Sequence, residues 1–376
     1  RPLQIAAQQA LGDFRGSITI LNPETGEVLA MASNPSFDPN LFDPTNRNSQ
    51  ALSETLDHPG KPLLNRAAQG IYPPGSVFKI PMMAAGLMSG LYTRDTPYTC
   101  TGRWDLLGPN AIKYDWTVTF GVPPHGKIDF VQALAFSCDP YFYTIAYNLY
   151  QFNPNYMSQI ARQFGLGKPT QVEQIPEDEG LIPDPAWKRA TYGEDWTPGD
   201  SVNMGIGQGY VLATPLQIAQ MMAAVRNGGT LYRPRLVQRI APPGGQPTYE
   251  LEPVVNGHLP TTPDQLALIQ EGLRDVTTLP GGTAHFVFPN FEIPVAGKTG
   301  TAEDPASGAP HAWFAGYTEA NRPDKPDIVI VVNVENTGEG SLFAAPIFKR
   351  MVEVYFLGRA YTLFPWESEF GLTGTP

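Results

Sequence analysis

The stretch SITILNPETGEVLAMA, residues 17–32, decides where the main sheet of the chain begins. Two runs of apolar and β-branched residues flank the turn residues between Asn22 and Gly26. A pair of such runs around a short polar turn is typical of a β-hairpin. We therefore expect the chain to open on a sheet.

Three more strands are predicted near the C-terminus, and short links join them. Because these links are too short for crossover helices, the strands are most simply antiparallel, and the opening hairpin can join the same sheet. An amphipathic helix over residues 343–358 is predicted to follow. The three strands are FEIPVAGKTGTA (291–302), HAWFAGYTE (311–319) and DIVIVVNVEN (327–336).

The middle of the chain is predicted to be mostly helical. Two intervening stretches, 33–72 and 93–127, are predicted to be ordered loop and irregular structure respectively. The helical segments have apolar residues at three- and four-residue spacing or end at glycine. They are 128–136, 141–150, 156–165, 214–229 and 262–277.

Together these elements predict an α/β fold of the α+β type, with an antiparallel sheet flanked by helices and an inserted all-helical lobe. We place the α/β subdomain at about 1–72 and 260–376, and the lobe at about 73–259. A cleft between the two parts is the default place for a ligand.

Composition restricts the class of protein. With 376 residues, 42% hydrophobic and 16% charged, the chain has the balance of a soluble globular protein. Its net charge of −11 disfavours a nucleic-acid partner, which requires a basic surface. No apolar run is long enough to span a bilayer. Because the chain begins at Arg1 rather than Met, we expect a processed or truncated piece that lacks an upstream anchor.

A lysine in an apolar stretch is the first chemical signal. Lys79 lies in GIYPPGSVFKIPMMAAGLMSGL, residues 70–91, three residues after Ser76. On a helix these two side chains are neighbours, so the lysine could take the proton of the serine if burial lowered its pKa. The alternative is a serine cap and a lysine that extends to solvent. Pro81 predicts a tight or kinked first turn.

A second signal is SCDPYFY, in which Ser137 and Asp139 flank Cys138. The Ser137 hydroxyl could relay a proton. Asp139 precedes Pro140, so it is also a plausible helix N-cap, a structural role that does not exclude a chemical one.

The third signal is GKTGTAE, residues 297–303, where glycine interrupts a strand pattern. Glycine in a strand suggests a close approach to the backbone. Thr299 and Thr301 share one face of the strand, and with the Lys298 ammonium they could hold a carboxylate. The alternative is an exposed strand end with one solvated lysine.

Taken together, the three motifs point to one family. S-x-x-K, a serine-led triplet and K-T-G form the set shared by β-lactamases and penicillin-binding proteins, and they occur here in that order. Nearly the whole chain resembles the transpeptidase domain of class B, monofunctional penicillin-binding proteins. The resemblance is carried by ILNPETGEVLAMAS, YPPGSVFK, CTG, MGIGQGYVLATPLQIA, NGGTLYRPRLV, GKTGTA and HAWFAGYT.

The resemblance implies roles for the motif residues. Ser76 would be the acylated nucleophile, and Lys79 the base that activates it. Ser137 would pass the proton to the departing D-alanine, and Lys298 would supply positive potential and complete the relay.

The same resemblance assigns the binding of the donor peptide. Asp139, Thr299, Gly300 and Thr301 would line the substrate, with the two threonines holding its terminal carboxylate. The backbone amides of Ser76 and Thr301 would form the oxyanion hole.

Asp139 departs from the commoner family triplet, which ends in Asn. An ionised aspartate only accepts hydrogen bonds, whereas asparagine also donates them. Elongation-type members of the family look similar to this chain in carrying Asp, so the resemblance favours a role in cell elongation over division. Asp139 could also pair with Lys79 and keep it protonated at rest.

The function implied is that of a D,D-transpeptidase. It would cross-link peptidoglycan stem peptides ending in D-Ala-D-Ala through an acyl-enzyme on Ser76, and β-lactams would acylate it. Its location would be extracytoplasmic, with an anchor outside this chain and a membrane glycosyltransferase as partner. The alternatives are a class D-like serine β-lactamase and a β-lactam-sensing receptor domain.

Neither a cofactor nor a metal is expected. The two cysteines, Cys100 and Cys138, lack the spacing of a metal site, and so do the five histidines. Gly205, Gly207 and Gly209 form a G-x-G-x-G string that predicts a turn, because it lacks the context of a dinucleotide-binding loop.

Overall fold

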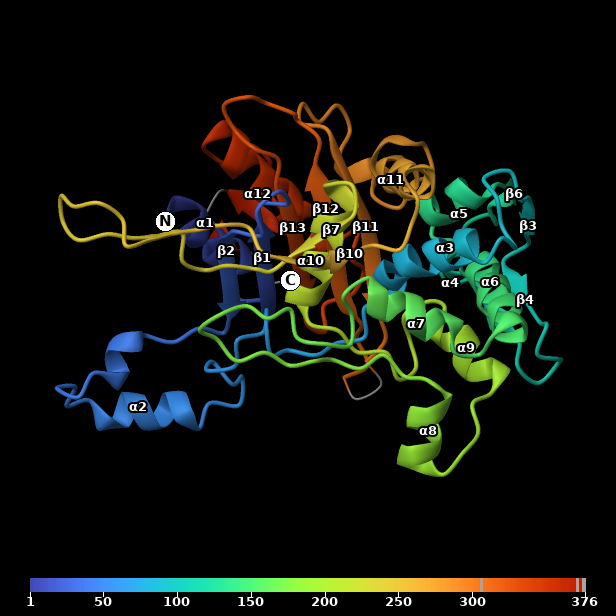
Figure 1. The fold of residues 1–376 in the computed structure, drawn as a ribbon, viewed down its shortest axis with the longest axis horizontal. Coiled ribbons are helices and arrows are strands. Elements are labelled where there is room, and N and C mark those ends of the chain that lie inside the picture. Colours follow the sequence, from blue (N-terminus) through green and yellow to red (C-terminus); the bar gives the residue numbers. More distant parts are fainter. Residues whose placement is uncertain (305–306, 370–371, 374–376) are drawn as a thin grey trace.

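A five-stranded antiparallel sheet forms the centre of the protein, in the order β11-β12-β13-β1-β2 (Figure 1). The computed structural model describes residues 1–304, 307–369 and 372–373. The opening hairpin joins the three late strands, which confirms the predicted sheet. These strands are β1 (Gly16–Leu21), β2 (Val28–Asn34), β11 (Val295–Ala302), β12 (His311–Thr318) and β13 (Val329–Val334).

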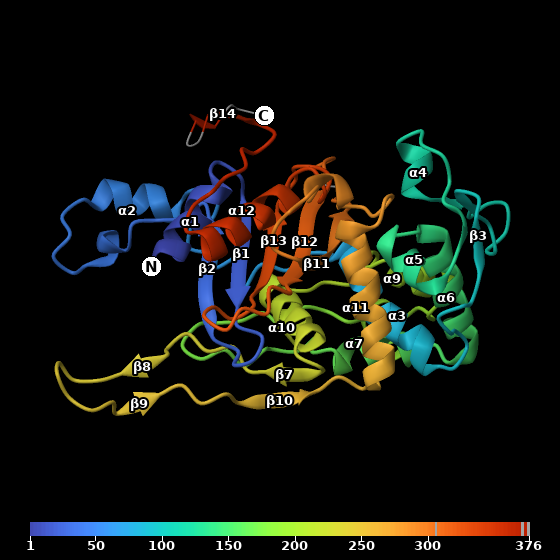
Figure 2. The same ribbon diagram turned by 90° about the horizontal axis from the view of Figure 1, so that it is seen from above.

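Both faces of this sheet are covered by helices. Ile330 and Val332 of β13 face the core that includes α1 (Pro2–Leu11) and α12 (Ala344–Leu357). Val329 and Val331 point the opposite way, into the core that includes α10 (Pro215–Arg226). Figure 2 shows α12 and α10 on opposite sides of the sheet. Alternate residues of the strand therefore serve two cores, which explains why it is apolar throughout.

The remaining helices extend the second of these cores beyond β11. Helices α5, α6 and α7 pack on α3, and α11 lies between this group and β11. Helix α10 packs on the sheet although its residues fall within the range predicted for the lobe, and the division into two subdomains stays a prediction. The helices of this region are η2 (Gly75–Phe78), α3 (Lys79–Met88), α4 (Trp116–Thr119), α5 (Phe130–Ala135), α6 (Asp139–Phe152), α7 (Tyr156–Gln163), α8 (Pro185–Tyr192), α9 (Pro198–Met204) and α11 (Pro263–Thr278).

Local sequence signals explain where the best-predicted helices begin. Helix α10 starts with a capping box between Thr214 and Gln217, and α11 with one between Thr262 and Gln265. In each helix a proline takes the first position, where no amide hydrogen is needed.

Two expectations about the first part of the chain are wrong. The chain opens on helix α1 rather than on a sheet, because Ala7, Ala10 and Leu11 bury a narrow apolar face. Residues 33–72 are not all loop, since they contain η1 (Pro39–Phe42) and α2 (Ser49–Leu56). Helix α2 buries none of its residues, so its sequence carries no clear periodic signal.

Short strands pair outside the main sheet, several of them within the stretch predicted to be irregular. Among the described residues, no helix is both long enough and apolar enough to cross a membrane. The remaining elements are β3 (Tyr98–Cys100), β4 (Arg103–Trp104), β5 (Lys113–Tyr114), β6 (Gly126–Ile128), β7 (Thr230–Tyr232), β8 (Arg239–Ile240), β9 (Tyr249–Glu250), β10 (Val255–His258), η3 (His285–Val287), β14 (Glu367–Glu369) and β15 (Leu372–Thr373).

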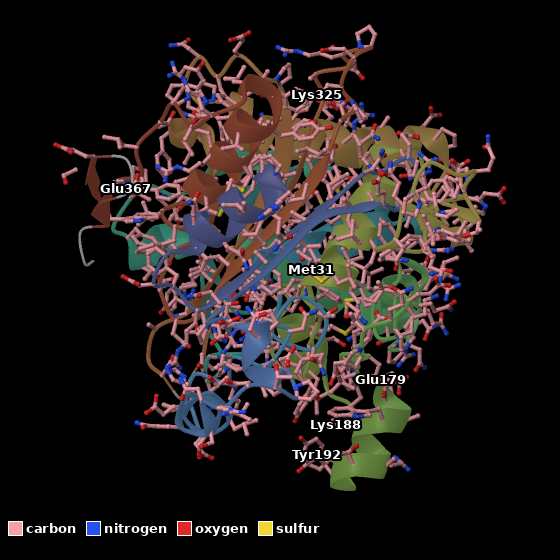
Figure 3. All side chains as sticks on the ribbon, turned by 90° about the vertical axis from the view of Figure 1, so that its left-hand side faces the viewer. Met31, Glu179, Lys188, Tyr192, Lys325 and Glu367 are labelled. Carbon is pink, nitrogen blue, oxygen red and sulfur yellow. The ribbon has the colours of Figure 1, made fainter. Side chains whose placement is uncertain are left out.

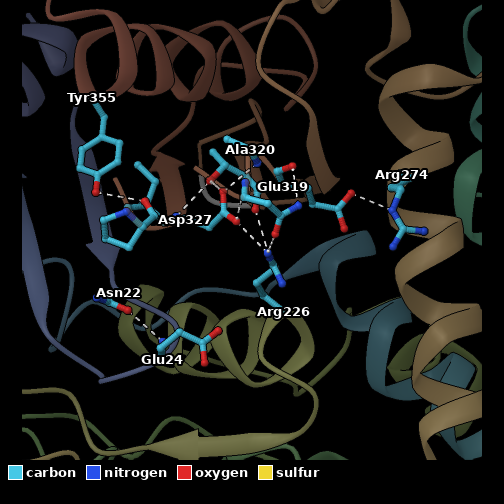
Figure 4. A network of polar contacts seen from close by, with 12 residues as sticks. Asn22, Glu24, Arg226, Arg274, Glu319, Ala320, Asp327 and Tyr355 are labelled. Carbon is cyan, nitrogen blue, oxygen red and sulfur yellow. Dashed lines mark hydrogen bonds and ion pairs between the residues drawn. The ribbon is translucent and has the colours of Figure 1, made fainter. Parts of the chain in front are cut away.

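A polar network fastens α10 to the connection between β12 and β13 (Figure 4). Arg226, the last residue of α10, donates to Asp327 Oδ2 at 2.7 Å and to Thr318 O at 3.1 Å. Asp327 is buried and also accepts from Thr318 Oγ1 at 2.7 Å and from the amide of Ala320 at 2.8 Å. The helix that covers one face of the sheet is thus tied to the ends of two strands.

Replacing Arg226 with Met should destabilise the protein by about 2 kcal/mol, because a buried carboxylate loses a charged donor but keeps its neutral ones. The matched control is Arg274→Met, which breaks the more exposed pair of Arg274 with Glu319 and should cost less than about 1 kcal/mol. Chemical denaturation of both variants measures this difference. Equal losses would contradict the assignment of a structural role to the Arg226 network.

Candidate active site

The segment that carries Ser76 is a tight 3-10 turn, η2, which passes into α3 at Lys79. This confirms the predicted tight first turn. Gly75 has φ +53°, and a Cβ there would lie 2.6 Å from the carbonyl oxygen of Thr301. Its amide donates to Gly207 O at 3.1 Å, so the predicted glycine turn braces the segment. Only glycine allows η2 to approach β11 this closely.

Lys79 is fully buried and turned inward. Its Nζ donates to Ser137 O at 2.8 Å, to Ser137 Oγ at 3.1 Å and to Asp139 Oδ1 at 2.6 Å. The alternative in which this lysine extends to solvent is therefore wrong. The three bonds use all three protons of an ammonium group and satisfy a buried charge.

Ser76 lies between Lys79 and the edge of the sheet. The neighbouring Val77 packs on β11, where a Cβ at Gly300 would meet its Cγ2 at 3.0 Å. Ser76 is partly exposed, and among the described residues no hydrogen bond uses its hydroxyl. It is not a helix N-cap, since Pro74 holds that place before η2. The hydroxyl is therefore free to meet a ligand.

The loop before α6 delivers Ser137 and Asp139 to Lys79. Ser137 is buried and has φ +55°, a conformation that costs an ordinary residue about 1 kcal/mol or more. Asp139 is not the N-cap, which corrects the prediction: it is the first residue of α6, and Cys138 precedes it as the cap residue. Its amide donates to Asp115 Oδ2 at 2.9 Å, and its carboxylate accepts from Lys79.

Lys298 is the second buried lysine of the site. Its Nζ donates to the carbonyl of Thr299 at 3.2 Å, and it forms no salt bridge with a carboxylate in the described part of the chain. Burial lowers its pKa well below the usual range, and the charge of Lys79 lowers it further, while Asp139 opposes the shift. Because Asp139 is bonded to Lys79, Lys298 has no carboxylate partner of its own, and the lowered pKa favours its neutral form.

The two threonines of β11 have different partners. The hydroxyls of Thr299 and Thr283 lie 2.7 Å apart, and either can be the donor. Thr301 Oγ1 donates to Glu339 Oε2 at 2.6 Å. Thr299 can therefore keep its proton for a ligand while Thr283 donates, whereas the proton of Thr301 is held by Glu339.

All eight residues singled out from the sequence thus gather in one place. Lys79, Ser137 and Asp139 are bonded directly, and the charge of Lys298 interacts with both charged members of that set. Residues 299–301 bring β11 against the turn that holds Ser76.

Three residues of the site were missed by sequence reasoning. Asp115 holds the amide of Asp139, while Thr283 and Glu339 hold the two threonines of β11. Each comes from a loop far along the chain from its partner. No local pattern in the sequence indicates these contacts.

Two thiols and a carboxylate also meet beside the site. Cys100, Asp115 and Cys138 are buried, and their ligand atoms all lie within 4.8 Å of one another. The cysteines are not bonded to each other, and a hydrogen bond with Cys138 lowers the pKa of the Cys100 thiol to about 7. Such a donor set suits Zn²⁺, so these residues could hold a metal that spacing along the chain did not suggest.

Comparison with known proteins identifies the family. Residues 16–353 match the penicillin-binding protein transpeptidase domain, and the chain belongs to this family. It is 35% identical over 362 residues to the peptidoglycan D,D-transpeptidase MrdA of Acinetobacter baumannii, covering 92% of this chain and 52% of that protein. The chain thus spans about half the length of this curated relative.

Solved structures confirm the fold. Penicillin-binding protein 2 of Pseudomonas aeruginosa, in complex with WCK 5153, superposes with a TM-score of 0.83 at 34% identity, over 99% of this chain and 77% of that one. A chain of a peptidoglycan synthase complex, described as coordinating polymerization and crosslinking, gives a TM-score of 0.83 at 35% identity, over 96% and 62%. The predicted transpeptidase-like fold is therefore correct.

Replacing Asp139 with Asn should change the pH dependence of acylation by benzylpenicillin. The Asp139 carboxylate raises the pKa of Lys298, so its loss lowers that pKa further, and it also removes the salt bridge to Lys79. The rise of the acylation rate with pH should move to lower pH by about one unit.

The control is Asp105→Asn, which removes a carboxylate from the exposed pair with Arg103 and should leave the profile in place. An unshifted profile in Asp139→Asn would count against electrostatic control of the lysines by this residue.

Proposed function

We propose that this chain is the transpeptidase unit of a D,D-transpeptidase that cross-links peptidoglycan stem peptides. Ser76 would be acylated by a peptide ending in D-Ala-D-Ala, and β-lactams would acylate the same hydroxyl. The observation that carries the proposal is the placement of an unbonded serine hydroxyl three residues before buried Lys79, in a 3-10 turn that packs on the strand of buried Lys298. Membership of the penicillin-binding family supports it.

The two lysines divide the proton chemistry between them. Lys79 is paired with Asp139, whereas burial lowers the pKa of Lys298 and so favours its neutral form. For Lys79 to take the proton of Ser76, it must first give up one of its own. Ser137 is the group placed for this transfer: its Oγ accepts from Lys79, and its own proton, which no bond of the described residues uses, would pass to the neutral amine of Lys298. It could later return a proton to the departing D-alanine.

The backbone of the site would stabilise the oxyanion. The amides of Ser76 and Thr301 are proposed as its donors, and Thr301 N lies 3.3 Å from the position that a Cβ on Gly75 would take. Glu339 would help by accepting a hydrogen bond from the Thr301 hydroxyl and so holding Thr301 in position. The terminal carboxylate of the donor would then bind through Thr299 and the positive potential of the lysines.

The setting of this reaction follows from the relatives. An extracytoplasmic location, an anchor outside this chain and a membrane glycosyltransferase partner are proposed, in keeping with the related chain in a peptidoglycan synthase complex. A role in cell elongation is proposed from the aspartate at position 139 and from the likeness to MrdA. No nucleic-acid partner is proposed, because the chain carries a net charge of −11.

Labelling with benzylpenicillin tests the proposal. Mass spectrometry should find one adduct per chain, located by peptide mapping at Ser76 and absent from Ser76→Ala. The adduct should persist in a transpeptidase, whereas a β-lactamase would release it rapidly. Transfer of a donor peptide to an added amine should separate a transpeptidase from a sensor. A missing adduct, rapid release, or a stable adduct without transfer would overturn the proposal.

The two threonines should differ when each is replaced with Val. Thr299→Val removes a hydroxyl that can donate to the donor carboxylate, so KM should rise about tenfold, as expected for one hydrogen bond to a charged group. Thr301→Val removes a proton already held by Glu339, so the effect on KM should be at least threefold smaller. Steady-state release of D-alanine measures both constants, and equal increases in KM would contradict this division of roles.

A further inference from the structure

A third lysine lies beside the active site without a role in the chemistry described above. Lys113, on β5, is partly buried. Its Nζ donates to Asn203 Oδ1 at 2.8 Å and lies 5.5 Å from the centre of the Tyr143 ring. It forms no salt bridge with a carboxylate in the described ranges, so an ammonium group here has a neutral amide and an aromatic face as its partners.

These three side chains offer hydrogen-bond donors and no free acceptor of comparable strength. The Asn203 oxygen is used by Lys113, which leaves the amide nitrogen with two N–H groups. The Tyr143 hydroxyl makes no hydrogen bond among the residues that the structure describes, and Lys113 has two further protons. A ligand with more than one acceptor oxygen could bind to these donors.

The cluster is connected to the catalytic groups through three separate elements. Tyr143 lies one turn after Asp139 on α6, so the two side chains share a helix face. Asn203 lies near the end of α9, just before the glycine turn that braces Gly75. Burial lowers the pKa of Lys113, and the charges of Glu303, which follows β11, and of Asp139 oppose that shift.

We propose that Lys113, Asn203 and Tyr143 form a subsite for a carboxylate of the peptide substrate other than its C-terminal one. The inference rests on the proposed function, which makes the ligand a peptide. A carboxylate offers two oxygens in one plane to donors on different elements. The negative charges of Asp139 and Glu303 nearby favour a single negative charge over a doubly charged group such as a phosphate.

Lys113→Met and a pair of donor peptides test the subsite. Both peptides end in D-Ala-D-Ala and differ only in whether the preceding side chain carries a carboxylate or the matching carboxamide. The wild-type protein should prefer the carboxylate by about tenfold in kcat/KM, mainly through KM, as expected for one charge-assisted contact. In Lys113→Met the ratio between the two peptides should fall towards one.

The matched control is Lys325→Met. Lys325 lies between β12 and β13, where its Nζ is 5.0 Å from the centre of the Tyr355 ring, and it is labelled in Figure 3. This variant should keep the full preference. Tyr143→Phe removes only a hydroxyl, so it should reduce the preference by about threefold while preserving the packing of the ring.

Two outcomes would overturn the subsite. The wild-type protein could show equal kcat/KM for both peptides, or Lys113→Met and Tyr143→Phe could slow both peptides by the same factor and leave their ratio intact. Either result would show that the three side chains have a structural role and do not bind a carboxylate of the substrate. If the wild-type protein were not acylated by benzylpenicillin at Ser76, the proposed function itself would fail, which is a different result.

Discussion

The close approach of two backbones, the turn at Gly75 and the strand at Thr301, is the constraint on which the rest of the site depends. A side chain at position 75 would collide with the Thr301 carbonyl, and the amide of Gly75 is held from behind by Gly207. This contact joins the sheet to a helix that lies over 200 residues earlier in the chain. Without it, Ser76 and Lys298 would belong to separate parts of the molecule.

The electrostatics of the site depend on this contact between the Gly75 turn and the strand at Thr301. Two lysines are buried in one place, and the carboxylate of Asp139 is bonded to only one of them. Burial of two like charges with one counter-charge is costly, and the least costly state leaves one amine neutral. Packing alone thus favours one neutral amine in the site. The strained conformation of Ser137 is stabilised by its bonds to Lys79 and serves the same arrangement.

Much of this arrangement could be predicted from the sequence, because its signals are local. Apolar and β-branched runs with short links predicted the antiparallel sheet, and apolar spacing or a terminal glycine predicted α10 and α11. Helices α1 and α2 were missed because their buried faces are narrow or absent. The site residues were found because motif residues lie close together in the sequence, in segments that the fold then brings together.

The partners of those residues could not be predicted in the same way. Asp139 has the sequence context of a helix cap, yet its amide donates to Asp115 and its carboxylate accepts from Lys79. Glu339 accepts a hydrogen bond from the Thr301 hydroxyl, although no residue pattern in the Glu339 loop predicts this contact. Lys113, Asn203 and Tyr143 come from three elements and carry no motif. Such contacts depend on tertiary packing, for which a single sequence gives no periodic or spacing signal.

The central claim is that burial in this fold lowers the pKa of Lys298 well below the ordinary range of a lysine. The most direct test is a pH titration of the lysine Cε and Nζ resonances by NMR in labelled protein, with Lys298→Met used to assign the signal. The account predicts that Lys298 titrates well below the ordinary lysine value of about 10.4, and that the shift becomes larger in Asp139→Asn. A Lys298 signal that titrates at the ordinary value would contradict it.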